Sequence, residues 1–151
     1  MIRALVGVFT VIIGVVALCV YLYQPAGVPA QIGILQIDDQ YGWEKITGQG
    51  NHSEVGKLIH SKAVLDYDYG ESVRTDPSGD FALISEIPVE GENGYTARVY
   101  EFDDNIELVV NVDSVDTRLD VLPRTLYAFG HCEDAQCKQA IITLATNLKE
   151  I

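Results

Sequence analysis

Two cysteines near the C-terminus, Cys132 and Cys137, are the residues whose types and spacing most directly suggest chemistry. In an oxidising compartment, two cysteines this close usually pair. A disulfide needs Cα atoms within about 7 Å, and residues five apart in a regular helix lie too far from each other for this bond. We therefore expect Cys132 to lie on a turn before a helix that carries Cys137, with a disulfide joining them.

Redox catalysis and metal binding are the alternatives for this pair. Thiol–disulfide enzymes typically place two residues between their cysteines at a helix start, where the helix dipole lowers the thiol pKa. Here four residues intervene, and two of them, Glu133 and Asp134, would raise the thiol pKa. His131 could act as a third metal ligand, but no second ligand pair stands at a recognised spacing. We expect neither a metal site nor a cofactor.

An acidic segment over residues 66–80 is the second candidate site. Its alternating carboxylates resemble part of a calcium loop, but Gly70 stands where the third acidic ligand would be. The composition instead predicts an exposed, solvated loop, and exposed tyrosines on a loop are common protein contacts. The candidate partner or cation loop consists of Asp66, Tyr67, Asp68, Tyr69, Glu71, Asp76 and Asp80.

The remaining polar residues do not form a catalytic motif. The three histidines are scattered, and no serine or cysteine nucleophile motif surrounds them. Asp113, Asp116 and Asp120 would share one face of a helix, which is typical of a solvated surface. Trp43 follows the N-terminal segment closely and could rest on a membrane or belong to a core. We predict that the protein is not an enzyme.

The N-terminal segment predicts a membrane anchor. Residues 4–23 form an uncharged run of 20 residues, dominated by Val, Ile, Leu and Ala. A helix of this length spans roughly 30 Å, the thickness of the hydrocarbon layer. Tyr21 and Tyr23 end the run at the expected interface. The anchor positions include Leu5, Val8, Ile12 and Val15, and Gly7 and Gly14 could let another helix approach closely.

The flanks of this run indicate its orientation. Arg3 precedes it, whereas residues 24–44 contain no Lys or Arg. The positive-inside rule then places the N-terminus in the cytoplasm and the following domain in the periplasm. A cleaved signal peptide remains an alternative, because residues 28–30 form a tolerable cleavage site. Lipidation at Cys19 is a poor match, because Leu18 precedes it.

Charge restricts the partners. All 22 acidic side chains follow residue 37, and nine basic ones follow the anchor, which gives that part a net charge of −13. Such a domain should repel nucleic acid and anionic lipid head groups. It could attract a basic protein or divalent cations, or its charge could serve solubility alone.

The pattern along the chain predicts an α+β protein. Residues 1–23 would form the transmembrane helix, 24–30 a short tether, and 31–151 a small antiparallel β-sheet domain ending in an amphipathic helix. Strands are expected over 31–37, 81–87, 95–102, 106–112 and 125–129, with the third and fourth joined as a hairpin by residues 103–105. Residues 52–65 fit either a helix or a strand. The helix is predicted from an apolar stripe made of Cys137, Ile141, Leu144, Ala145 and Leu148.

These features favour a non-catalytic accessory or assembly subunit of an inner-membrane protein complex. Its partners would be membrane subunits, contacted through the anchor and through the outer domain. The alternative is a membrane-tethered periplasmic binding module for a basic protein or a divalent cation.

Overall fold

A computed structural model describes residues 29–38, 41–51, 53–71, 73, 77, 79–112 and 124–151. These residues contain one helix, α2 (Ala135–Thr146), and are otherwise mostly β-strand. The strands are β1 Ala30–Ile32, β2 Leu35–Ile37, β3 Glu44–Gln49, β4 Ser53–His60, β5 Ala63–Gly70, β6 Ala82–Pro88, β7 Thr96–Phe102, β8 Asn105–Val112, β9 Arg124–His131 and β10 Leu148–Glu150.

The predicted α+β class is wrong, because the domain is mainly β. The segment that fitted either a helix or a strand forms β4 and the start of β5, and β5 continues to Gly70 through the first part of the predicted loop. The predicted transmembrane helix at residues 4–23 lies outside the described residues. Among the described residues, no helix is long and apolar enough to cross a membrane.

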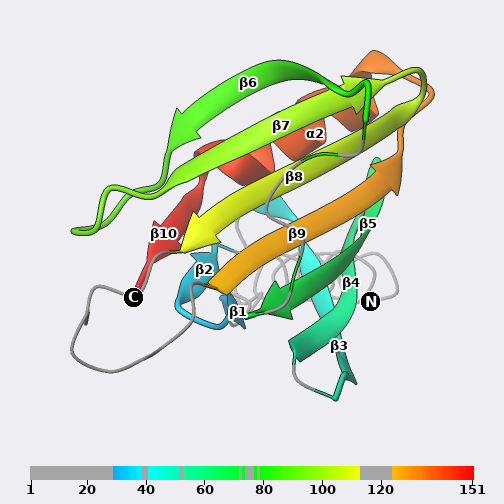
Figure 1. Ribbon diagram of the computed structural model, residues 1–151. Helices are drawn as coiled ribbons and strands as arrows, with labels where there is room; N and C mark the ends of the chain where they lie inside the picture. The colour runs from blue at the N-terminus through cyan, green and yellow to red at the C-terminus, as the bar shows by residue number, and fades with distance from the viewer. Residues whose placement is uncertain are drawn as a thin grey trace, which may run out of the picture.

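Seven strands form one antiparallel sheet in the order β3-β4-β5-β9-β8-β7-β6 (Figure 1). The predicted hairpin is confirmed: β7 and β8 pair from Phe102 opposite Asn105, and Asp103 in the turn has a φ of 51°. The predicted strands over 81–87 and 125–129 are confirmed as β6 and β9. Residues 31–37 form not one strand but two, because the chain turns at Gly33 and Ile34.

The two faces of the large sheet differ. We call the face that packs against α2 and the small sheet β1-β2-β10 the inner face, and the opposite one the outer face; Figure 1 shows α2 behind β7 and β8. Side chains alternate between the faces along each strand. On β5, Leu65, Tyr67 and Tyr69 point inward and are buried, whereas Val64 and Asp66 point outward and are exposed.

The amphipathic helix at the C-terminal end is confirmed, with a shorter span than the apolar stripe suggested. Asp134 caps its N-terminus by accepting a hydrogen bond of 2.8 Å from the backbone N–H of Cys137. The helix buries Cys137, Ile141, Leu144 and Ala145 of the stripe against the sheet. It ends at Thr146, and Leu148 begins β10, which pairs with β2.

Trp43 belongs to the core. It is buried, and its ring stacks on His60 of β4 with 5.1 Å between the ring centroids.

Candidate functional site

The two C-terminal cysteines lie at the junction of β9 and α2. Their Sγ atoms are 1.96 Å apart and their Cα atoms 5.5 Å apart, which is the arrangement of a disulfide. Cys132 precedes the helix, as the predicted pairing requires, and its backbone N–H donates to the carbonyl of Asp104. Both cysteines are buried in the core. This position is suited to fastening the helix to the sheet.

The predicted acidic loop does not form a single site. Its first residues belong to β5, so their side chains point to opposite faces of the sheet. Asp66 is exposed on the outer face, beside Lys57, whereas Tyr67 and Tyr69 are buried on the inner face. The prediction that these tyrosines are exposed is therefore wrong.

The other acidic residues of that segment are also separated. Asp68 points outward and is half-buried, and Glu71 pairs with Arg124 beyond the end of the strand. Asp80 is exposed next to β6, and Asp76 lies outside the described residues. Within the described ranges, no group of three or more His, Cys, Asp or Glu side chains could hold a metal ion.

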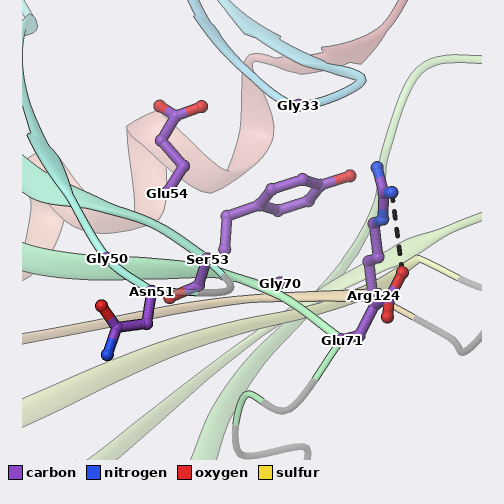
Figure 2. Close-up of a pocket in the computed structure, with 9 residues that line it drawn as sticks. Gly33, Gly50, Asn51, Ser53, Glu54, Gly70, Glu71 and Arg124 are labelled. Carbon is purple, nitrogen blue, oxygen red and sulfur yellow. Dashed lines mark ion pairs between the residues drawn. The ribbon is translucent and has the colours of Figure 1, made fainter.

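A pocket of about 450 Å³ lies where four separate parts of the chain meet. The parts are the β1–β2 turn, the β3–β4 loop, the end of β5 and the start of β9. Figure 2 shows the Arg124–Glu71 ion pair on one side of this pocket and Glu54 on the other, with Gly33 above them. The lining residues are Gly33, Gly50, Asn51, Ser53, Glu54, Tyr69, Gly70, Glu71 and Arg124.

The carboxylate of Glu54 is held by two neighbours on the inner face. Lys45 Nζ lies 2.7 Å from Glu54 Oε1, and the Tyr67 hydroxyl donates to the same oxygen at 2.8 Å. Burial raises the pKa of the Tyr67 hydroxyl to about 12, and the charge and hydrogen bond of Glu54 add to the rise. Glu54 is therefore a satisfied part of the pocket wall.

Tyr69 lies beneath the β1–β2 turn. Gly33 has a φ of +57°, and a Cβ atom there would lie 2.1 Å from the Tyr69 ring, so only glycine fits. The Tyr69 side chain is 5% exposed, and its hydroxyl is buried with no hydrogen-bond partner. A buried hydroxyl without a partner is uncommon and costs free energy.

The outer face carries a buried carboxyl group. Glu107 of β8 has no exposed surface, and the Tyr127 hydroxyl of β9 donates to its Oε1 at 2.6 Å. Val109 and Thr125 on the same face are also buried. This part of the outer face is therefore covered.

The rest of the outer face carries exposed apolar side chains. Five of these residues are between 38% and 55% exposed, and each of the five lies on a different strand. We call them the apolar band: Ile46, Val64, Leu83, Phe102 and Phe129. Strand register places Leu83, Phe129 and Ile46 in one row across the sheet. Tyr100 and Glu107 lie between Leu83 and Phe129, and Asp66 and Lys57 lie between Phe129 and Ile46. Phe102 and Val64 lie in the neighbouring row, two residues along from Tyr100 and Asp66. Phe102 additionally packs on Phe81, with ring centroids 5.7 Å apart.

The sequence of β9 carries a signal for part of this band. Residues 126–129 are Leu, Tyr, Ala and Phe, so apolar and aromatic side chains fall on both faces of this strand. A short strand that is apolar on both sides is typical of burial on both faces.

The chain was compared with protein-family models, with curated proteins and with solved structures, and nothing matches it.

Proposed function

We propose that the protein is a non-catalytic accessory subunit that binds a partner protein of a membrane complex through the apolar band. The observation that supports this proposal is the presence of five large exposed apolar side chains on one face of the sheet. Single exposed apolar residues are ordinary, but five on one face of a sheet, with polar side chains between them, suit contact with a partner protein.

The band also has the composition of an interface. Two phenylalanines and three aliphatic residues make up its members, and aromatic side chains are enriched in protein contacts. Charged pairs lie between and beside them, among them Lys57–Asp66 and Arg98–Glu86. Apolar side chains interspersed with polar groups are the usual composition of the surface through which separately folded proteins bind each other.

The partner we propose is a basic protein with an apolar contact surface. The part of the chain after residue 23 carries a net charge of −13, so positive side chains around the partner's apolar contact would be attracted. This attraction should raise the association rate and should weaken as salt is added.

The proposed location is the periplasmic side of the inner membrane, with residues 4–23 as the anchor. This location is argued from the sequence of that segment alone. Extraction of membranes at alkaline pH tests it: the protein should remain in the membrane pellet. Release into the soluble fraction would contradict the proposed anchoring and leave the apolar band to be judged separately.

The test of the proposed function is gentle detergent extraction of the tagged full-length chain, followed by mass spectrometry of the stoichiometric components. A double variant, Val64→Asp with Phe129→Asp, places two charges in the band. It should lose the partner while the domain stays folded, because both side chains are exposed. Gln139→Asp on the exposed side of α2 is the matched control and should keep the partner.

Each result of this extraction decides the proposal. A heteromeric complex that depends on the band and weakens with salt supports it. A monomer, an assembly of identical chains, or a complex that survives the double substitution overturns it.

A further inference from the structure

The pocket beneath the β1–β2 turn contains an arginine that is weakly held. Arg124 Nη2 lies 3.7 Å from Glu71 Oε1, which is too long for a hydrogen bond, and these side chains are 48% and 40% exposed. An exposed ion pair of this kind contributes little stability. The planar guanidinium group carries five N–H donors and binds a carboxylate best through two of them at once. Arg124 is therefore suited to exchange Glu71 for a ligand carboxylate.

The Tyr69 hydroxyl is a second, independent indication of a ligand. Tyr69 lines the same pocket, and its buried hydroxyl lacks a hydrogen-bond partner. The ring lies directly against Gly33, another lining residue. A ligand oxygen that accepts this hydrogen bond would remove the cost of the unpaired hydroxyl. Because the hydroxyl has almost no exposed surface, the turn at Gly33 must shift outward when such an oxygen binds.

Charge argues against a ligand that is only an anion. Glu71 lines the pocket, and the surrounding domain is strongly acidic. A purely anionic molecule would be repelled by this field. A ligand with both a carboxylate and an ammonium group would not be repelled. Its carboxylate would pair with Arg124, and its ammonium group would pair with Glu71 after Arg124 releases it. The number of ion pairs is then preserved or increased.

We propose that this pocket binds a free α-amino acid as its zwitterion. The carboxylate would contact Arg124 and the Tyr69 hydroxyl, and the ammonium group would contact Glu71. The volume of about 450 Å³ lies within the range of small-molecule sites and leaves room for a side chain. This site is independent of the apolar band, so either proposal can fail without the other.

Isothermal titration calorimetry on the purified full-length protein tests the site. L-alanine, L-leucine, L-phenylalanine, L-lysine and L-glutamate serve as separate probes. At least one should bind, and its C-terminal amide and its N-acetyl derivative should each bind at least about tenfold more weakly, since each lacks one charge. Binding by none of the probes overturns the proposal. Equal binding of the N-acetyl derivative overturns the assignment of a zwitterion.

A substitution of Arg124 and a control substitution test whether Arg124 contacts the bound amino acid. Arg124→Gln should weaken binding at least about tenfold, because a neutral amide cannot replace the charge-assisted contact. Arg98→Gln is the control, since Arg98 is also an exposed arginine that pairs with a glutamate, Glu86, but it lies outside the pocket. Unchanged affinity in a folded Arg124→Gln protein overturns the proposal.

Tyr69→Phe separates a ligand contact from a structural role. It removes only the unpartnered hydroxyl, so the stability of the protein alone should not fall. Affinity for the amino acid should fall several-fold, because the proposed hydrogen bond is lost. A variant that is less stable but binds equally well would show that the hydroxyl serves the fold, and would remove Tyr69 from the site.

Discussion

Two tyrosines on the inner face of β5 have opposite polar environments. Tyr67 donates its hydroxyl to Glu54, which Lys45 also contacts, whereas the hydroxyl of Tyr69, two residues along, has no partner. The two tyrosines thus differ in hydrogen bonding: the Tyr67 hydroxyl meets the Glu54 carboxylate, whereas the Tyr69 ring lies against Gly33 of the β1–β2 turn. Tyr67 belongs to a satisfied polar network of the fold, and Tyr69 is the residue of the pair that a ligand could complete.

The raised pKa of Tyr67 predicts a loss of stability in alkaline solution. The folded-state pKa of about 12 lies above the ordinary value of 10, so the fold retains this proton more tightly than the unfolded chain. The resulting stabilisation is complete below pH 10 and is lost as pH rises toward 12. Urea unfolding at pH 9 and pH 11 measures it. In Tyr67→Phe the free energy of unfolding should fall less between the two pH values. An identical fall would contradict the assignment of this stability loss to the Tyr67 hydroxyl.

The hydrogen bond from Tyr127 to the fully buried Glu107 predicts the cost of losing that hydroxyl. Tyr127→Phe should lower the free energy of unfolding by about 1–3 kcal/mol, because the carboxyl group cannot turn to water instead. Tyr100→Phe is the control, since Tyr100 lies on the same face directly beside Glu107. Chemical denaturation compares the two variants. Equal losses of unfolding free energy in the two variants would show that the hydrogen bond to Glu107 does not stabilise the fold measurably.

At the scale of elements, local patterns were sufficient for some parts of the fold. The β7–β8 hairpin was predicted because alternating residues flank a short acidic turn that forms it without distant help. Strand β5 was not predicted over its full length, because residues 66–69 alternate Asp with Tyr and their acidic composition favours a loop. Their period of two residues was the better signal: both tyrosines point inward and both aspartates outward.

The pocket could not be predicted in this way. Ser53 and Gly70 pair at the open end of the β4–β5 hairpin, but Gly33 and Arg124 come from distant parts of the sequence, and only the tertiary fold brings them to that hairpin. No short motif marks them. The pairing of β5 with β9, which skips three intervening strands, is a non-local contact that periodicity alone does not specify.

The N-cap of α2 predicts a measurable contribution to stability. Asp134→Ala removes the side chain that accepts from the N–H of Cys137 and should cost about 1 kcal/mol. Glu133→Ala, one residue earlier and exposed, should change stability by only a few tenths of a kcal/mol. Thermal or urea unfolding distinguishes them. A larger effect at Glu133 would contradict the assigned cap.

The placement of Cys132 and Cys137 predicts the thiol content of the protein. Alkylation of the denatured, unreduced chain should label only Cys19 of the three cysteines, and prior reduction should expose all three. Intact mass spectrometry counts the labels. Replacing both cysteines by serine should cost stability toward the low end of about 2–4 kcal/mol, since the closed loop is short. Three labels without reduction would show that the pair is not oxidised.

At the scale of the whole molecule, the two faces of the large sheet have different roles. The inner face is closed by α2 and the small sheet and contains the core. The outer face keeps Ile46, Val64, Leu83, Phe102 and Phe129 partly exposed to water. Exposure of this much apolar surface is unfavourable for an isolated domain, and contact with a partner would remove it from water.

Photocrosslinking in intact membranes tests whether the apolar band is a protein-binding surface. A benzophenone amino acid is placed at Phe129 within the band, and at Gln139 on the exposed side of α2 as the control. We expect one defined adduct from position 129, to the same protein that co-purifies stoichiometrically with the full-length chain, and none from position 139. Adducts only to a second copy of this chain, or no adduct from position 129, would contradict it.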